Sequence, residues 1–558
     1  MSRSIRLSVL AGLPALLLVS LEASGQTMLL VPEIHHDTSP AVRDLPRTPK
    51  VRVRPHAAEP VRRIPLPPGL KPKREFDRAL QLRPKGPAPA GPTFAPVITH
   101  QFAGLGSGQY GFSIGVAPPD TNGAVGDTQY VQWVNASFAV FDKASGTLLS
   151  GPTDGNDLFT GFGGACETQD DGDGIVLYDK PAKRWIIAQF AVGASPDLEC
   201  VAVSQTSDAT GKYNRYSFSA PAGELNDYPK IGVWPDAYYT TFNMFNTSTN
   251  AFLGARACAY DRGAMLAGQT ATQVCFQLAS GVGGLLPADL DGNQPPPAGS
   301  PNYLLAFGSS ALDLYKFHVN FATPASSTFT GPASIAVASF TPLCDGGTCV
   351  PQPGVTQQLD SLADRLMYRL AYRNLGGNEV LLANHSVTAG SAGGIRWYEL
   401  QNPNAAPVVT QQGTYAPDSN YRWMGSIAMD QVGDVVVGFS EANGSTLHPS
   451  IYVAGRRPAD PANTLESEVQ VFAGKGSQST GLSRWGDYSA MTVDPADDCT
   501  FWYTQEYLLT TGTFDWNTGI VSFTVPGCGP VPNPPTNLKV SGIGRRGVSE
   551  GPPAAISP

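Results

Sequence analysis

The stretch SRWGDYSAMTVDPADDCTFWYTQEY, residues 483–507, has the clearest structural pattern in the chain. It opens with polar and aromatic residues and continues as a short run of small and apolar residues. It then turns at Asp494-Pro495 and ends in alternating aromatic and polar residues. Two short runs of this kind, separated by a turn, are typical of consecutive antiparallel β-strands. The stretch therefore predicts one half of a β-meander.

Looser versions of this stretch recur six times upstream, beginning at Asp120, Asp171, Asn226, Ser300, Ala363 and Arg422. The starts lie about 50 to 75 residues apart, a spacing that fits propeller blades with inserted loops. The 60 glycines and 49 prolines are spread along the chain, so long helices have little room. We therefore predict an all-β protein, a β-propeller with seven blades over residues 93–529.

The N-terminal residues have the composition of a targeting segment. Arg3 and Arg6 precede an apolar run that is followed by small residues. This order predicts a secretory signal peptide over residues 1–25, with an uncleaved N-terminal anchor as the alternative. No other stretch is apolar enough to span a bilayer. We expect a secreted monomer, released outside the cell or held in the periplasm or at the cell surface.

The segments that flank the repeats differ from them in composition. Residues 26–92 are rich in Pro, Arg and Lys, with 13 basic and four acidic residues between Arg43 and Lys85. Such a segment predicts a disordered spacer, and a pro-segment or a basic arm for an anionic surface are the alternatives. Residues 530–558 predict a disordered tail or the truncated start of a fibronectin type III-like module.

The net charge of the repeat region excludes one class of partner. Residues after position 85 contain 22 basic and 39 acidic residues, a net charge of about −17. Nucleic-acid binding needs concentrated positive charge, so we expect no nucleic acid as a partner.

Eight cysteines, all within the repeat region, predict disulfides because an even number in an exported chain favours them over thiol chemistry. Neighbour pairing is the simplest arrangement, and it predicts the bonds Cys166–Cys200, Cys258–Cys275, Cys344–Cys349 and Cys499–Cys528.

Several phrases of the chain resemble those of known proteins. NDYPK, YRWMGSIAMD and RWGDYSAM resemble phrases in large families of secreted bacterial proteins that have no assigned activity. DPADDCTFW, residues 494–502, distantly resembles the Asp-box turn of sialidase-like propellers, with Cys499 where the motif has Gly. The resemblance implies a secreted, sialidase-like propeller and no particular activity.

In a propeller, the starts of the innermost strands meet at the axis, so equivalent residues of distant repeats become neighbours. Carboxylates, guanidiniums and aromatic rings there suit acid–base chemistry, bidentate binding and stacking on sugars. The candidate ligand-binding residues are Arg365, Arg369, Arg396, Arg422, Trp423, Arg484, Trp485, Tyr488, Asp227 and Asp364. Analogy with sialidase-like enzymes adds the catalytic candidates Asp120, Asp487, Glu399 and Tyr368. The alternative is that these groups only bond the backbone of the next blade.

Two short loops have the Asp/Asn/Gly composition of calcium sites. The first contributes Asp171 and Asp173, and the second contributes Asp289, Asp291 and Asn293. These oxygens predict calcium as a cofactor, although an ordinary Asx-turn explains each loop equally well. No phosphate-binding loop follows a strand, so no nucleotide cofactor is expected.

Three functions fit these predictions. The leading one is recognition of carbohydrate or a cell-surface polymer at the propeller axis. The alternatives are a sialidase-like glycoside hydrolase or lyase, and a structural adhesion module. The sequence leaves open whether the protein is an enzyme.

Overall fold

The computed structural model describes residues 26–45, 57–67, 70, 77–81, 94–479 and 481–529. The expected signal peptide and C-terminal tail lie outside these residues. Among them, no helix is long and apolar enough to cross a membrane.

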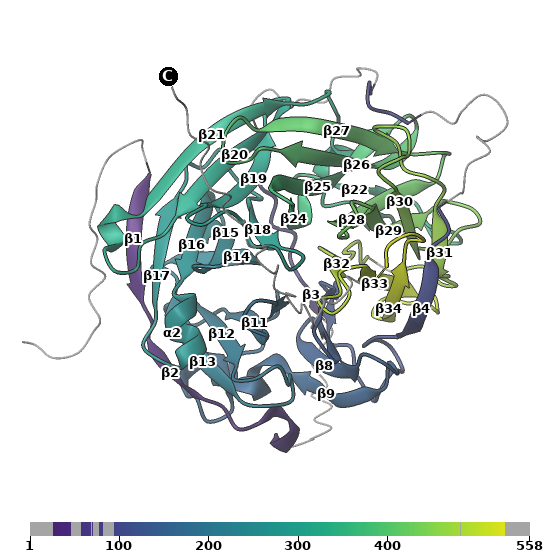
Figure 1. Ribbon diagram of the computed structural model, residues 1–558. Helices are drawn as coiled ribbons and strands as arrows, with labels where there is room; N and C mark the ends of the chain where they lie inside the picture. Colours follow the sequence, from purple (N-terminus) through teal and green to yellow (C-terminus); the bar gives the residue numbers. More distant parts are fainter. Residues whose placement is uncertain are drawn as a thin grey trace, which may run out of the picture.

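The structure is an all-β propeller in which antiparallel sheets radiate from a central axis (Figure 1). The first three sheets, innermost strand first, are β6 (Asn122–Val125), β7 (Gln129–Val134), β8 (Ser137–Asp142) and β9 (Leu148–Asp154); β10 (Ile175–Asp179), β11 (Arg184–Ala191), β12 (Leu198–Ser204) and β13 (Tyr213–Ser219); and β14 (Glu224–Val233), β15 (Tyr238–Asn246), β16 (Phe252–Tyr260) and β17 (Thr272–Gln277).

The chain continues around the axis with β18 (Leu286–Leu290), β19 (Asn302–Gly308), β20 (Ala311–His318) and β21 (Thr328–Ala336); β24 (Met367–Leu375), β25 (Asn378–Ala389), β26 (Ala392–Gln401) and β27 (Val408–Tyr415); β28 (Tyr421–Met429), β29 (Val435–Ala442), β30 (Ser450–Arg456) and β31 (Val469–Phe472); and β32 (Ala490–Val493), β33 (Thr500–Leu508) and β34 (Trp516–Thr524).

The last group gains its outer strand from the N-terminal side of the ring. Strand β4 (Val97–Ala103) pairs antiparallel with β34, so that Phe102 lies opposite Ile520. Strand β32 also packs against β6. The ring is therefore closed by chain segments from both of its ends.

The described strands form seven four-stranded groups, the same number as the sequence repeats. However, β18 pairs in parallel with β24, which joins the fourth and fifth groups into one eight-stranded sheet. The all-β propeller prediction is confirmed. The number of blades stays a prediction, because it depends on how this eight-stranded sheet is divided.

The core lies between neighbouring sheets, and the inner strands are buried on both faces. Strand β33, the aromatic half of the stretch at 483–507, is buried along its whole length. The four disulfides join the cysteine pairs that neighbour spacing predicts, and this pairing is confirmed. Four disulfides are consistent with an extracellular protein.

The remaining elements are short. They are the strands β22 (Thr348–Val350), β23 (Leu359–Asp360) and β5 (Val116–Ala117), the helices α1 (Gly164–Thr168) and α2 (Arg262–Ala267), and the 3-10 turns η1 (Val42–Asp44), η2 (Gly155–Phe159), η3 (Pro324–Ser326) and η4 (Leu343–Gly346).

The described parts of residues 26–92 differ from the expected disordered spacer. Strand β1 (Thr27–Pro32) adds a fifth strand outside β17, and β2 (His35–Thr38) does the same outside β13. Strand β3 (Ala57–Ala58) pairs in parallel with β5 near the axis. This ordering arises from pairing with sheets far along the sequence, which local composition does not reveal.

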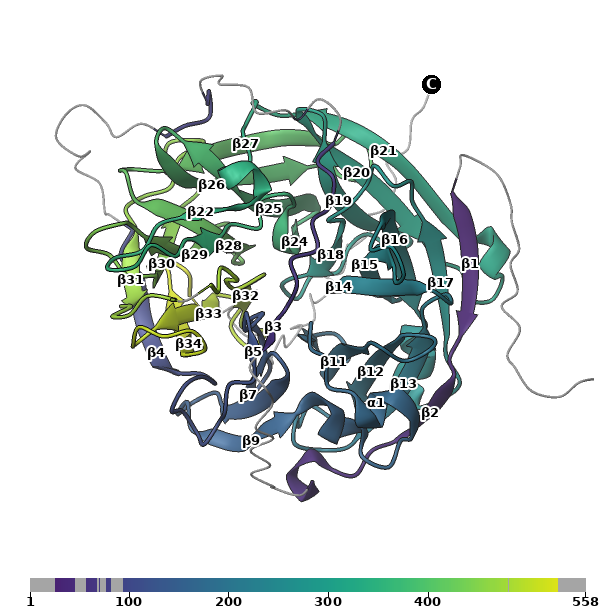
Figure 2. The same cartoon turned by 180° about the vertical axis from the view of Figure 1, so that it is seen from behind.

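Residues 57–67, which we call the strap, continue from β3 across the centre of the ring (Figure 2). Ile64 is buried against Leu225 and Phe245. Its backbone N–H donates to the Asp364 carboxylate (3.2 Å), and Arg62 pairs with Asp227 (2.8 Å). The strap is thus held by apolar packing and by charge.

Candidate functional site

The innermost strands bring acidic residues together at one end of the axis. Asp120 precedes β6, Asp173 precedes β10, and Asp487 precedes β32. All three have left-handed backbone conformations, with φ of 47°, 48° and 44°. This conformation costs free energy for a residue other than glycine and tends to persist at functional sites. The equivalent positions of distant repeats therefore meet, as the propeller prediction required.

Two of these residues form a compact acidic group with the strap. One carboxylate oxygen from each of Glu59, Asp120 and Asp173 lies within 4.8 Å of the others. Asn135 supports the group, because its amide donates to Glu59 Oε1 (3.1 Å) and its Oδ1 accepts from the Asp173 N–H (2.9 Å). A Cβ at Gly172 would lie 2.5 Å from that Oδ1, so only glycine fits beside this contact.

Arginines balance several neighbouring acids. Arg484 forms a two-point ion pair with Asp487, at 2.6 and 2.8 Å. Its Nε also donates to the backbone carbonyl of Glu59 (3.0 Å), which fixes the strap. Arg365 binds Asp364 through Nε (2.8 Å). These guanidiniums are therefore committed to partners outside the acidic group.

A buried lysine lies among tyrosine rings beside the acids. The Lys230 ammonium lies 3.4 Å from the Tyr228 ring centroid and 3.9 Å from that of Tyr488. Tyr368 is the third ring, at 5.9 Å. Burial lowers the pKa of Lys230 to about 7, although Asp173 opposes this change. The lysine can therefore gain or lose a proton near neutral pH.

Three acids at this end, Asp173, Asp120 and Glu59, have raised pKa values. Burial, together with the charge of Asp227, raises the pKa of Asp173 to about 7. Burial is also the main cause for Asp120 and Glu59, whose pKa values are raised well above their usual range, with further contributions from the neighbouring carboxylates. At neutral pH this end of the axis can therefore hold both carboxylic acid and carboxylate. We call the side chains at this end the axial cluster. It is centred on Glu59, Asp120 and Asp173 and includes their neighbours Arg484, Asp487, Lys230 and the tyrosines around it.

Nine of the residues singled out in the sequence lie in the axial cluster. They are Asp120, Asp173, Asp227, Asp364, Arg365, Tyr368, Arg484, Asp487 and Tyr488. The structure thus brings together residues that are more than 350 positions apart in the chain.

Arg369 follows Tyr368 on β24 and has a different environment. It pairs with Asp289 (2.8 Å) and with Asp291, and Lys180 also binds Asp291 (2.9 Å). These cations hold the pKa of Asp291 well below its usual range even though burial opposes this. Asp289 and Asp291 thus have cationic side chains as partners, and Asn293 of the same loop is exposed; calcium at this loop stays a prediction.

Glu399 and Arg396 do not reach the axis, contrary to expectation. Both lie on β26, the third strand of its group, where Glu399 accepts from Gln411 (2.7 Å) and Arg396 donates to Thr414 (2.6 Å). Arg396 also pairs with Asp77. The phrase IRWYEL resembles the start of an innermost strand in composition, but its place in the meander is different.

Arg422, Trp423 and Trp485 are also internal groups. Arg422 binds Glu441 (3.0 Å) and Glu468 (2.6 Å), which belong to outer strands or their connections. The two tryptophans are fully buried and pack on each other with ring centroids 5.8 Å apart. They form core contacts and offer no aromatic surface to a ligand.

The two aspartates of the first Asp/Gly loop have different roles. Asp171 accepts from the backbone N–H of Val192 (2.8 Å), the contact of an ordinary structural turn. Asp173 points into the axial cluster instead. Asp171 and Asp173 therefore have different partners, and calcium at this loop stays a prediction.

Four residues of the cluster were missed from the sequence: Glu59, Arg62, Tyr228 and Lys230. Tyr228 and Lys230 stand in the NDYPK phrase, so that phrase was a usable signal. Glu59 and Arg62 stand in a Pro- and Arg-rich segment whose composition gave no sign of a site.

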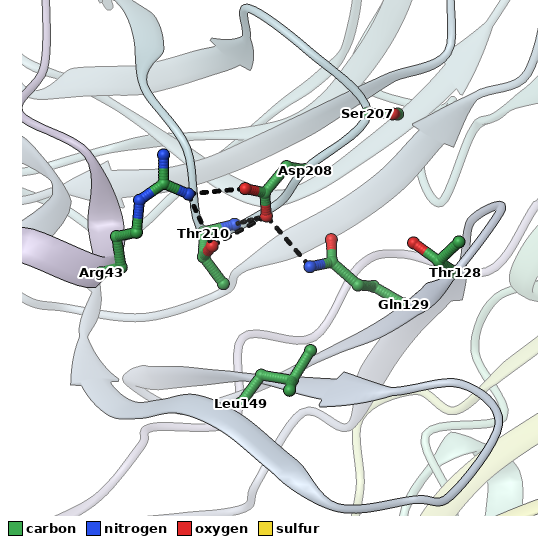
Figure 3. A pocket seen from close by; sticks show the side chains of 7 residues that line it. All are labelled: Arg43, Thr128, Gln129, Leu149, Ser207, Asp208 and Thr210. Atoms are coloured by element: carbon green, nitrogen blue, oxygen red, sulfur yellow. Dashed lines mark hydrogen bonds and ion pairs between the residues drawn. The ribbon is translucent and has the colours of Figure 1, made fainter.

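A shallow pocket of about 410 Å³ lies elsewhere, where η1 meets β7 and the loop after β12 (Figure 3). Asp208 stands at its centre and accepts from Gln129 (3.0 Å), Thr210 and Arg43 (2.6 Å). Burial raises the pKa of Asp208, but these donors outweigh burial and lower it to about 2. The carboxylate is occupied in holding η1 to the ring.

Comparisons with known proteins assign no family. No protein-family model matches the chain, and no curated protein sequence matches it. Among solved structures, an α-L-arabinanase from Penicillium chrysogenum is similar over 66% of this chain and 99% of its own, with 10% identity and a TM-score of 0.32.

Two further structures have similar scores. The phage phi92 endosialidase matches 83% of this chain and 70% of its own, with 8% identity and a TM-score of 0.31. Prolyl oligopeptidase B from Galerina marginata matches 69% and 47%, with 11% identity and a TM-score of 0.34. At these identities and TM-scores the likenesses support no activity or ligand.

Proposed function

We propose that the protein recognises a carbohydrate or a related cell-surface polymer at the axial cluster. The observation that carries this proposal is Asp120, a fully buried residue whose two carboxylate oxygens accept no hydrogen bond. A buried carboxylate without donors destabilises the folded state. Asp120 also has a left-handed backbone conformation, and its neighbours have perturbed pKa values. Residues that combine these unfavourable features are typical of functional sites.

The chemistry of the cluster suits a polyhydroxylated ligand. Carboxylates accept hydrogen bonds from sugar hydroxyls, and the two oxygens of Asp120 are without a donor here. The rings of Tyr228 and Tyr488 form walls of the cluster, although the Lys230 ammonium lies over both of them. A binding site of this kind combines a few convergent polar groups with aromatic walls.

The strap covers this cluster, so a ligand can reach Asp120 only when the strap moves. Arg62, Arg484 and Ile64 hold it through the contacts described above. The proposed function therefore includes displacement or cleavage of residues 57–67 before the polymer binds.

The test compares the chain from residue 26 with a variant whose strap is loosened, Arg62→Ala with Ile64→Ala. Arg43→Ala is the matched control, because it removes an arginine that pins the same N-terminal segment far from the axis. A glycan array should show binding by the loosened variant that exceeds binding by the parent chain and the control. If the loosened variant folds and binds no glycan or polymer, the proposal fails and a structural adhesion module gains support.

A glycoside hydrolase is the second candidate, because Asp120 and Asp173 form an acid pair with raised pKa values. One oxygen of each lies within 4.8 Å of the other, closer than the roughly 6.5 to 9.5 Å between the carboxyl groups of inverting glycosidases. Hydrolysis therefore predicts new reducing ends with retained configuration, lost in Asp120→Asn. Binding without reducing ends would leave recognition as the function.

A further inference from the structure

The oxygens of Glu59, Asp120 and Asp173 have the spacing of ligands around one cation. Oxygens that bind Ca²⁺ lie about 2.3 to 2.6 Å from it, so two of them are at most about 5 Å apart. The three carboxylates provide oxygens within 4.8 Å of one another. One ion could therefore contact all three side chains without a rearrangement of the backbone.

Asp120 supplies the observation that points to a ligand. Its side chain is fully buried, and neither oxygen accepts a hydrogen bond. Its two partners in the group each use one oxygen, since Glu59 accepts from Asn135 and Asp173 accepts from the Tyr228 N–H (3.0 Å). Asp120 alone has two oxygens without a donor, and at least one of them lies within 4.8 Å of the other two carboxylates.

The neighbouring cationic side chains form no ion pair with these three carboxylates, although the charges of Arg484 and Lys230 act on them. Arg484 binds Asp487 at two points, and Arg62 binds Asp227. The Lys230 ammonium lies over tyrosine rings and donates to the Pro229 carbonyl (2.8 Å). Among the described side chains, the three carboxylates therefore have no ion-pair partner of their own.

In a second group of three carboxylates, an arginine side chain of the same protein provides the positive charge. Asp418, Glu441 and Glu468 also place oxygens within 4.8 Å of one another. There the Arg422 guanidinium binds all three, at 2.9, 3.0 and 2.6 Å. No described side chain plays this part between Glu59, Asp120 and Asp173.

We propose that Glu59, Asp120 and Asp173 together bind one divalent cation, with Ca²⁺ as the best match to an all-oxygen group. Calcium prefers carboxylate and carbonyl oxygens and accepts six to eight of them, so water completes its shell. Glu59 belongs to the strap, whereas the other two residues belong to the ring. The ion therefore fastens the strap across the axis, whatever the axial cluster recognises once it is open.

The test uses the chain from residue 26, stripped with EDTA and titrated with Ca²⁺ by calorimetry. We expect one site per chain and a rise in Tm on binding. Asp120→Asn keeps the shape of the side chain and should weaken binding at least tenfold. Asp418→Asn, in the group filled by arginine, is the matched control and should bind Ca²⁺ as the parent chain does.

Trypsin provides a readout of the strap that does not depend on glycan binding. Cleavage after Arg62 or Arg63 should be slow with Ca²⁺ and at least tenfold faster in EDTA. Glu59→Gln, which changes only the strap, should remove this protection and keeps the proposal testable if Asp120→Asn fails to fold.

Absence of saturable binding of Ca²⁺, Mg²⁺ or Mn²⁺ up to about 10 mM, above the range typical of extracellular calcium modules, would overturn the proposal. Unchanged affinity in both Asp120→Asn and Glu59→Gln would overturn it as well. In either case, a proton shared between the carboxylates would explain how the three acids can lie together.

Discussion

Asp173→Asn should flatten the dependence of stability on pH. Burial and neighbouring charge raise the pKa of Asp173 from 3.8 to about 7. Between these values the folded chain holds a proton that the unfolded chain has lost, so stability falls as pH rises from 4 to 7. The difference of about three units corresponds to about 4 kcal/mol. Asparagine does not ionise, and its amide oxygen can still accept from the Tyr228 N–H.

Thermal unfolding in EDTA at pH values between 4 and 7 measures this effect. For a domain of this size, about 4 kcal/mol corresponds to a change in Tm of about 4 °C. The Tm of the parent chain should therefore fall about 4 °C further across this range than that of Asp173→Asn. EDTA is needed because a bound cation would keep the carboxylates ionised.

Asp142→Asn is the control for this experiment. Hydrogen bonds from Ser145 lower the pKa of that exposed carboxyl, so it does not titrate between pH 5 and 7. Its profile should run parallel to that of the parent chain. Parallel profiles for Asp173→Asn and the parent chain would refute the claim that the axial cluster takes up protons on folding.

Three further variants test other parts of the structure. Lys230→Met should remove a rise in stability between about pH 7 and 10.5, where the unfolded lysine is protonated and the folded one is not, as seen in Tm against pH. Arg369→Met should destabilise the fold by about 3 to 5 kcal/mol in urea unfolding, because it leaves the buried Asp289 without its cation and Asp291 with Lys180 alone; an unchanged midpoint would contradict this. Replacing Cys499 and Cys528 by alanine opens a loop of 29 residues and should lower stability by about 3 to 4 kcal/mol, which reduction of the parent chain should reproduce.

The repeat pattern was enough to predict the propeller and much of its axis, because closure of the ring places equivalent positions together. Asp120 and Asp487 could be paired in this way although 367 residues separate them. The neighbour pairing of cysteines succeeded for a related reason. Strands that follow one another in sequence are adjacent in the sheets, as Cys258 and Cys275 are on β16 and β17.

The predicted positions of some side chains were wrong because the composition around a residue does not show which strand of its sheet it occupies. Glu399 follows an apolar and aromatic run like those of the inner strands, but β26 is the third strand of its group. The Arg422 side chain is close to the expected start of an inner strand, yet it binds Glu441 and Glu468 in the interior. Neither difference could be predicted, because side-chain direction depends on contacts made between strands.

The strap could not be predicted because its order depends on partners far along the chain. Arg62 pairs with Asp227, and Arg63 lies 3.9 Å from Asp360, so both strap arginines meet acids of the propeller. A Pro-rich basic segment has the same composition whether it is solvated or bound to an acidic surface. Its net charge was the one available hint, since a basic segment and a ring of about −17 attract each other.

Neutralisation alone does not explain the strap. A segment that only offset the charge of the ring would bring basic residues to the axis, as Arg62 does. Glu59 instead adds a carboxylate beside Asp120, at the place where buried acids already lack cationic partners. An added acid there raises the pKa values of its neighbours and lowers stability at neutral pH unless something positive joins the group. The arrangement is therefore best explained by a third participant, and calcium titration distinguishes a metal ion from a proton.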